Sequence, residues 1–253
     1  MNMDLLIKKF GLSGLRGIVT GGSAGIGKQI TLTLAEAGAE VFTFSRSGKF
    51  KENDNNSLNI RHIKIDITNT ETCTSAIKEI GNNGLDFVIN NAGVTIKKKF
   101  ENLSVEEWEK IRNVNIDAVV NICKTAYPFL KKSALPGRII NIGSMAAHLG
   151  FSMVVPYAVT KSAVTGLTRA LAVEWAGDNI LVNSVSPGWI KTDMVESVLD
   201  EEREKKIKNR MPLHKLGSTE DIADMVWYLV STASEYITGQ DFAVDGGALA
   251  YGY

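Results

Sequence analysis

Short apolar segments alternate with longer amphipathic segments along most of this chain. The short segments are rich in β-branched residues and predict six buried strands, at 17–20, 41–44, 62–65, 87–89, 138–142 and 181–185. A seventh strand is expected at 241–244, before the turn Asp245-Gly246-Gly247. Strands separated by helix-length segments are typical of βαβ units, whose strands lie parallel in one sheet. The pattern therefore predicts an α/β fold with a parallel sheet.

The amphipathic segments predict five helices, at 25–37, 70–82, 105–130, 156–176 and 219–231. Gly38 suits the C-cap of the first helix, and Ser104 and Thr219, each followed by acidic residues, suit N-caps. The Asn- and Lys-rich stretch 49–59 predicts an exposed loop, and the charged stretch 200–210 predicts a solvated helical face. Neither a repeat nor a Pro/Gly/Ser linker divides the chain, so we predict a single domain.

The composition excludes several classes of function. The 253 residues contain 28 Lys+Arg and 28 Asp+Glu, so the chain lacks the basic excess that nucleic acids or anionic membranes require. We therefore expect a small-molecule substrate, no nucleic acid and no membrane. Cys73 and Cys123 show no ligand spacing with the three histidines, so no metal site is expected. Without the pattern of a signal peptide or transmembrane helix, the sequence predicts a cytoplasmic protein.

A glycine-rich sequence, Thr20-Gly21-Gly22-Ser23-Ala24-Gly25-Ile26-Gly27, follows the first predicted strand and opens the first helix. Glycines at such a turn let backbone N–H groups approach a pyrophosphate at the helix N-terminus. The spacing differs from G-x-G-x-x-G by one residue, and glycine also serves ordinary turns. The strand before this sequence and the helix after it favour dinucleotide binding.

Three motifs together resemble the short-chain dehydrogenase/reductase family: the glycine-rich sequence, Asn90-Asn91-Ala92-Gly93, and Tyr157-Ala158-Val159-Thr160-Lys161. The resemblance spans nearly the whole chain and continues through Asn115, Ser144 and Pro187-Gly188 in the family's order. It implies one Rossmann-type domain with a seven-stranded parallel sheet and helices on both faces. The cofactor half would span about 14–140 and the catalytic half about 141–253, with a mobile substrate lid at about 193–213. It also implies a homotetramer or homodimer, in which the helices at 105–130 and 156–176 form four-helix interfaces, with Tyr251 and Tyr253 adding contacts.

The resemblance also implies a set of cofactor contacts. Asp66 would hold the adenine amino group, although it could instead be a strand-end turn residue. The segment 187–192 would hold the nicotinamide carboxamide, with Ile190 acting through its backbone. The full implied set is Gly21, Ser23, Gly25, Ile26, Gly27, Ser45, Arg46, Asp66, Ile67, Asn91, Ala92, Gly93, Tyr157, Lys161, Pro187, Gly188, Ile190 and Thr192.

The end of the second strand bears on the choice between NAD and NADP. An acid there would bind the ribose 2′-OH of NAD, whereas an arginine would pair with the 2′-phosphate of NADP. The sequence has no acid at Ser45, and the Arg46 guanidinium suits a phosphate. Arg46 could also be an ordinary exposed cation, and Ser23 and Ala24 stand where many NADP-using relatives carry a basic residue. We predict that NADP(H) is preferred over NAD(H).

Reduction of a ketone requires a proton donor and groups that stabilise the developing oxyanion. Tyr157 and Lys161 share a helix face, so the ammonium charge would favour the phenolate. Ser144 follows the fifth strand, at the sheet edge where ligands gather. Taken alone, Tyr157 and Lys161 could be an ordinary surface pair, and Ser144 an ordinary turn residue. The resemblance implies that the catalytic set is Asn115, Ser144, Tyr157 and Lys161. In the implied mechanism, Tyr157 protonates the carbonyl oxygen and Ser144 orients it. Lys161 tunes the pKa of Tyr157 and binds the nicotinamide ribose, and Asn115 holds a relay water.

The resemblance places the substrate pocket at Ser144, Ala146, His148, Phe151, Met153, Val154, Tyr157, Trp189 and Met194. His148 could bond a polyol hydroxyl, although a lone histidine more often has a structural role. Leu135 and Val173 stand where reductases of acyl carrier protein substrates carry arginines, and neither attracts an acidic partner. The segments 170–176 and 186–189 are similar to those of polyol, sugar and sugar-acid dehydrogenases.

We therefore predict an oxidoreductase that transfers hydride between NADP(H) and a small ketone or secondary alcohol, in the class of polyols, sugars or sugar acids. The alternative is a 3-oxoacyl thioester reductase acting on acyl carrier protein substrates. A non-catalytic NADP(H)-binding sensor or scaffold is a third hypothesis, and the intact catalytic set speaks against it.

Overall fold

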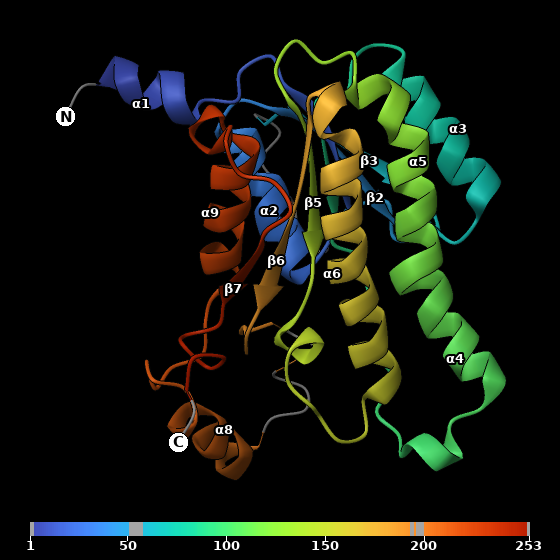
Figure 1. Ribbon diagram of the computed structural model, residues 1–253, viewed down its shortest axis with the longest axis vertical. Helices are drawn as coiled ribbons and strands as arrows, with labels where there is room; N and C mark the ends of the chain where they lie inside the picture. Colours follow the sequence, from blue (N-terminus) through green and yellow to red (C-terminus); the bar gives the residue numbers. More distant parts are fainter. Residues whose placement is uncertain (1–2, 51–57, 193–194, 196–199, 252–253) are drawn as a thin grey trace.

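Seven parallel strands form one sheet in the part of the chain that the structure describes. The computed structural model describes residues 3–50, 58–192, 195 and 200–251 (Figure 1). The strands are β1 (Arg16–Thr20), β2 (Glu40–Ser45), β3 (Ile60–Lys64), β4 (Phe87–Asn90), β5 (Gly137–Ile142), β6 (Ile180–Pro187) and β7 (Asp241–Val244). Their order is β3-β2-β1-β4-β5-β6-β7. The chain thus reverses its direction of travel across the sheet after β3, which opens a crevice for ligands at the carboxyl ends of β1 and β4. The predicted parallel α/β fold is confirmed.

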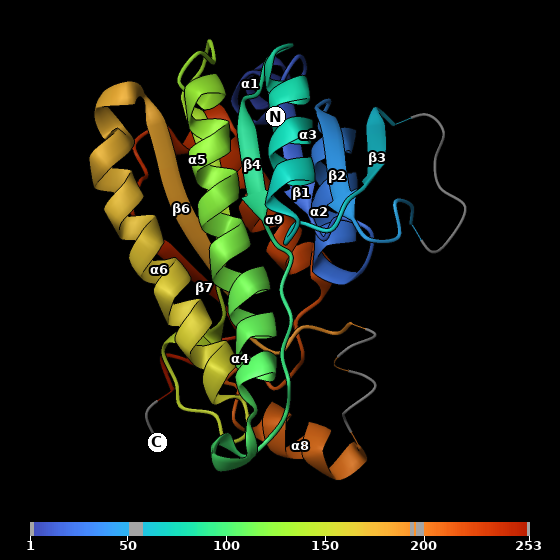
Figure 2. The ribbon, with the colours of Figure 1, turned by 90° about the vertical axis from the view of Figure 1, so that its right-hand side faces the viewer.

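Helices cover both faces of this sheet (Figures 1 and 2). Helices α2 (Gly25–Glu36) and α9 (Thr219–Val230) cover one face, and α3 (Thr70–Gly81), α5 (Ala118–Leu130) and α6 (Val155–Trp175) cover the other. The structure also describes α1 (Met3–Phe10), α4 (Val105–Arg112) and α8 (Glu201–Asn209). Successive strand residues enter opposite layers: Ile139 packs in the core beneath α3, α5 and α6, and Ile140 packs in the core beneath α2 and α9. Strands that are buried on both faces consist of nearly continuous apolar residues, so the sequence pattern predicts them.

The structure corrects two expectations about helices and strands and adds one helix. The predicted helix 105–130 is divided, because a π-helical turn at Asn113–Asp117 separates α4 from α5. The predicted strand 62–65 is β3, which begins and ends earlier, at Ile60–Lys64. The N-terminal helix α1 was not predicted, and it docks where Trp227 Nε1 donates to the Phe10 carbonyl oxygen at 2.8 Å.

The charged stretch 200–210 forms α8, as expected. Asp200 caps this helix by accepting from the Arg203 amide at 2.7 Å. Acidic residues fill its first turn and basic residues its last turn, which complements the helix dipole. Part of the predicted loop 49–59 lies outside the described residues, at 51–57. In the described part of the chain, no helix combines the length and apolar character that crossing a bilayer requires.

Candidate active site

The glycine-rich loop joins the end of β1 to the start of α2. Gly21 and Gly25 adopt positive φ angles of 65° and 52°, which favour glycine over other residues. A Cβ on Gly27 would overlap the carbonyl oxygen of Gly21 and the side chain of Asn91. Ala24 stands at the N-cap of α2 and offers no side-chain acceptor to the first helical amides. Those amides are therefore available to an anion, and the loop fits the pyrophosphate of a dinucleotide.

The segment after β4 is hydrogen-bonded to this loop. The Thr20 hydroxyl accepts from the amides of Asn91 and Ala92 at 3.0 and 3.1 Å, and Asn91 Nδ2 donates to the Thr20 carbonyl oxygen at 2.9 Å. Asn90 lies inside the molecule, where its Nδ2 donates to Asn141 Oδ1 on β5 at 2.8 Å. The two neighbouring asparagines therefore have different roles, since Asn91 shapes the loop and Asn90 ties two strands together.

At the end of β2, Ser45 stabilises a tight turn. Its hydroxyl accepts from the Gly48 amide at 3.0 Å, and Gly48 has a φ of 65°. The turn presents Arg46 to solvent at the carboxyl end of the sheet. Hydrogen bonds from the Thr68 amide and hydroxyl lower the pKa of Asp66, and the nearby charge of Arg46 also lowers it. Arg46 and Asp66 therefore share one side of the predicted cofactor site.

Tyr157 and Lys161 project from the first turns of α6. The Lys161 ammonium lies 5.6 Å from the centroid of the Tyr157 ring and donates to the Ile142 carbonyl oxygen at 2.6 Å. Only 5% of Lys161 is exposed. This burial disfavours the charged form and lowers the pKa of Lys161 to about 8. The ammonium therefore sits between the end of β5 and the tyrosine ring.

Ser144 lies two residues after β5 and starts a single 3₁₀ turn, Met145–Ala147. Its hydroxyl oxygen accepts from the Ala146 amide at 3.1 Å. Burial raises the pKa of Tyr157, while a hydrogen bond from the Ser144 side chain lowers it. Ser144 and Tyr157 therefore meet, as their predicted roles require, and the phenol remains protonated at neutral pH.

Asn115 occupies the middle of the π-helical turn. Its Oδ1 accepts from the Val94 amide at 2.9 Å, and its Nδ2 donates to the Val94 carbonyl oxygen at 2.9 Å and to Thr160 Oγ1 at 3.0 Å. A Cβ built on Gly93 would lie 3.6 Å from both Asn115 Oδ1 and Lys161 Nζ. The four predicted catalytic residues are thus gathered around the start of α6. The supporting contacts of Val94 and Thr160 carried no recognisable signal in the sequence.

The predicted substrate residues lie on two connections beside this cluster. Phe151 and Trp189 form an edge-to-face pair with ring centroids 6.4 Å apart. Met153 has a φ of 68°, and its carbonyl oxygen accepts from the Lys98 amide at 2.8 Å. His148 Nε2 is bonded to Asp241 Oδ2 at 2.6 Å, so this ring nitrogen already has a partner within the protein. Met194 lies outside the described residues.

Comparisons with known proteins agree with this geometry. A family described as "Enoyl-(Acyl carrier protein) reductase" matches residues 21–248. The 3-oxoacyl-[acyl-carrier-protein] reductase of Aquifex aeolicus is 36% identical over 244 residues, covering 93% of this chain and 98% of the relative. The 2-dehydro-3-deoxy-D-gluconate 5-dehydrogenase of Bacillus subtilis is 33% identical over 254 residues, covering 98% and 100%. This chain belongs to the short-chain dehydrogenase/reductase family.

The fold of this short-chain dehydrogenase/reductase also matches solved structures. The gluconate 5-dehydrogenase of Burkholderia cenocepacia, crystallised with NADP and tartrate, has a TM-score of 0.88 and 27% identity and covers 96% of this chain and 98% of its own. The relatives are dehydrogenases and reductases acting on CH–OH groups, so this chain is an oxidoreductase. Among the described residues, no cluster of three or more His, Cys, Asp or Glu side chains could hold a metal ion.

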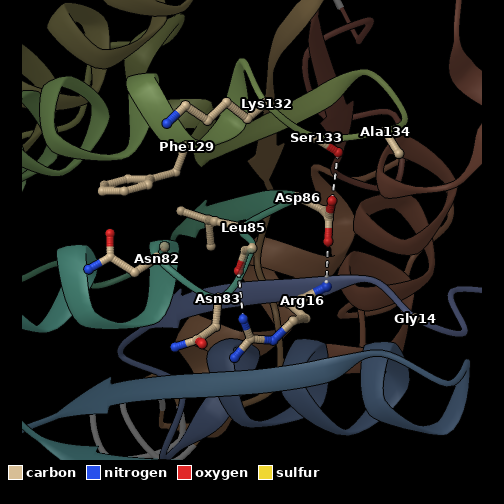
Figure 3. Close-up of a pocket in the computed structure, with 12 residues that line it drawn as sticks. Gly14, Arg16, Asn82, Asn83, Leu85, Asp86, Phe129, Lys132, Ser133 and Ala134 are labelled. Carbon is tan, nitrogen blue, oxygen red and sulfur yellow. Dashed lines mark hydrogen bonds between the residues drawn. The ribbon is translucent and has the colours of Figure 1, made fainter.

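A separate cavity of about 420 Å³ opens at the opposite edge of the sheet (Figure 3). Arg16 and Asp86, near the amino ends of β1 and β4, are among its lining residues. The Asp86 carboxylate accepts from the Arg16 amide at 2.8 Å and from the Ser133 hydroxyl at 2.6 Å. Arg16 Nη1 donates to the Gly84 carbonyl oxygen at 2.9 Å. These groups join the starts of the strands to the end of α5, far from the catalytic cluster.

Proposed function

We propose that this short-chain dehydrogenase/reductase transfers hydride between NADP(H) and a small ketone or secondary alcohol, with polyols, sugars or sugar acids as the substrate class. The observation that carries the proposal is the meeting of Ser144, Tyr157 and Lys161 at the carboxyl edge of the sheet, beside the glycine-rich loop. Asn115 Oδ1 and this ammonium group both lie beside Gly93. A sensor or scaffold has no chemical need for this arrangement.

The proposed roles follow from the contacts of each residue. The nicotinamide cofactor supplies the hydride when it is bound. Tyr157 holds a proton because burial raises its pKa, and it donates this proton to the substrate oxygen as negative charge develops there. Ser144 donates a hydrogen bond to the same oxygen, and the Lys161 ammonium stabilises the phenolate that remains. Oxidation of an alcohol reverses each step.

The proposed preference for NADP(H) rests on the turn at the end of β2. The buried Ser45 hydroxyl is used to close this turn, and no carboxylate stands there to bind a ribose 2′-OH. Arg46 is exposed beside it, where its guanidinium can bind a 2′-phosphate. The solved relative from Burkholderia cenocepacia, which contains NADP, supports this preference.

The gluconate dehydrogenase relatives support the proposed substrate class. The 36% identity to the Aquifex aeolicus reductase favours a second candidate, reduction of 3-oxoacyl thioesters on acyl carrier protein. The surface argues against that candidate, because Val173 on α6 is 82% exposed and Leu135 is 37% exposed. Apolar side chains at these positions offer no attraction to an acidic carrier protein.

A substrate screen tests the choice. We would follow NADPH oxidation with keto sugars, keto sugar acids and acetoacetyl thioesters at matched concentrations. The proposal expects a higher kcat/KM with the keto sugars or keto sugar acids. A much higher kcat/KM with the acetoacetyl thioester would establish the second candidate instead.

We also propose that the protein assembles as a homotetramer or homodimer through α5 and α6. Val120 on α5 and Val159 on α6 are 37% and 48% exposed in the single chain. Apolar surface on neighbouring helices is stabilised when a second copy covers it. Light scattering at micromolar concentration is expected to give the mass of two or four chains, and a monomer would contradict the proposal.

A further inference from the structure

A largely buried carboxylate on β7 binds the loop that carries Ser144. Asp241, the first residue of β7, has only 11% of its side chain exposed. It pairs with Ser184 in the parallel ladder between β6 and β7, and Ser186 follows on the same face of β6. Both serine hydroxyls donate to the carboxylate, Ser186 at 2.9 Å from each oxygen. His148 Nε2 binds Asp241 Oδ2 at 2.6 Å.

These contacts fix the chain on both sides of Ser144. On one side, the Gly143 amide donates to the Val185 carbonyl oxygen at 2.7 Å, and a Cβ on Gly143 would lie only 2.6 Å from Ser186 Oγ. On the other side, the 3₁₀ turn after Ser144 ends at His148, whose ring is held by Asp241. One flank of Ser144 is therefore fixed to β6 and the other to the neighbouring strand β7.

We propose that Asp241 and His148 are positioning residues that act through Ser144, a role that rests on the proposed function. A hydroxyl that stabilises a developing oxyanion must be held to within about 0.5 Å, which a loop achieves only when its own residues are anchored. The carboxylate is suited to this task because it binds the His148 imidazole through a charge-assisted bond, and Ser186, which lies against Gly143, holds it on β6. The bond between His148 and Asp241 joins residues 93 positions apart in sequence.

Three variants separate positioning from general stability. His148→Leu removes the donor to Asp241, and His148→Gln keeps a donor with similar reach. Ser184→Ala is the matched control, because it removes one hydrogen bond to the same carboxylate without touching the loop. We expect His148→Leu to lower kcat about tenfold, with the dissociation constant of NADPH unchanged. His148→Gln is expected to restore most of the loss, and Ser184→Ala to stay near the wild-type kcat.

A double-mutant cycle with Ser144→Ala tests whether His148→Leu lowers kcat through Ser144. If His148 acts through Ser144, His148→Leu has no further effect on kcat once the hydroxyl is absent. Equal effects of His148→Leu in both backgrounds would overturn the proposal, because His148 would then act independently of Ser144.

Hydrogen–deuterium exchange gives a second readout that requires no turnover. The amides of Ala147, His148 and Leu149 donate within this turn. We expect peptides covering 144–149 to exchange faster in His148→Leu than in the wild type or in Ser184→Ala. Equal exchange in all three proteins would overturn the proposal. Failure of the wild type to reduce any ketone or oxidise any secondary alcohol would instead reject the proposed function. The exchange data would still decide whether Asp241 and His148 order the loop.

Discussion

Burial has opposite consequences for the two ionisable side chains at the centre of the site. It disfavours the charged form of each, so it raises the pKa of the Tyr157 phenol and lowers the pKa of the Lys161 ammonium to about 8. The phenol therefore keeps its proton until a substrate oxygen becomes basic enough to take it. The lysine keeps its charge near neutral pH and loses it in mildly alkaline solution.

Lys161 gives a prediction about stability. Between about pH 8 and pH 10.5, its ordinary value, the unfolded chain binds this proton and the folded chain does not. Raising the pH through this window therefore favours the folded state by up to about 3 kcal/mol. We expect the free energy of unfolding of the wild type, measured in urea without cofactor, to rise relative to that of Lys161→Met across the window. A constant difference between the two proteins would contradict the lowered pKa.

Arg46 gives a prediction about cofactor choice. Arg46→Ser removes the proposed partner of the 2′-phosphate, and a hydrogen bond to a charged group is worth about 1.5–3 kcal/mol. We expect the dissociation constant of NADPH, measured by nicotinamide fluorescence, to rise at least about tenfold while that of NADH changes little. Arg61→Ser, which removes an exposed arginine paired with Glu40 on the neighbouring strand, is the control. Equal weakening of both cofactors by Arg46→Ser would reject the assignment.

At the scale of elements, the π-helical turn between α4 and α5 determines the position of Asn115. A continuous helix over 105–130 was the natural prediction, because the apolar pattern continues through the π-helical turn without a proline or glycine at 113–117. The turn brings the Asn115 amide to Val94 and to Thr160 on α6. Such insertions depend on contacts between distant segments, so periodicity along the sequence does not reveal them.

Two threonines of α6 make a matched test of this arrangement. The Thr160 hydroxyl accepts from Asn115 Nδ2 at 3.0 Å and donates to the Tyr157 carbonyl oxygen. The Thr168 hydroxyl likewise accepts from Asn141 Nδ2 at 2.9 Å and donates to the Val164 carbonyl oxygen. Both are fully buried.

Replacing either threonine by valine leaves a buried asparagine with one partner fewer, at a cost of about 1–3 kcal/mol in the free energy of unfolding. We expect Thr160→Val also to lower kcat by roughly five- to twentyfold, because it releases Asn115, which lies with Lys161 beside Gly93. Thr168→Val is expected to keep the wild-type kcat. Steady-state kinetics and urea unfolding of both variants check this, and equal kcat values would show that Thr160 is only structural.

For the whole molecule, the sequence predicted the fold better than the details of the site. Buried strands such as β4 and β5 are continuous apolar runs, so their number and order of appearance followed directly from the pattern. The helix α1 escaped prediction because it packs mainly through its C-terminal end, and Met3, Leu5 and Ile7 remain exposed. The contact of His148 with Asp241 joins segments that no local pattern relates.

The most direct test of the proposed chemistry compares the wild type with Tyr157→Phe. NADPH binding is followed by nicotinamide fluorescence, and turnover is followed with the best ketone substrate from the screen. Because a positioned general acid contributes about 10²- to 10⁴-fold, we expect Tyr157→Phe to lose at least about a hundredfold in kcat. Its dissociation constant for NADPH should change far less, because Tyr157 is one of many expected cofactor contacts. An unchanged kcat would contradict the assignment of Tyr157 as the proton donor, and with it the proposed chemistry.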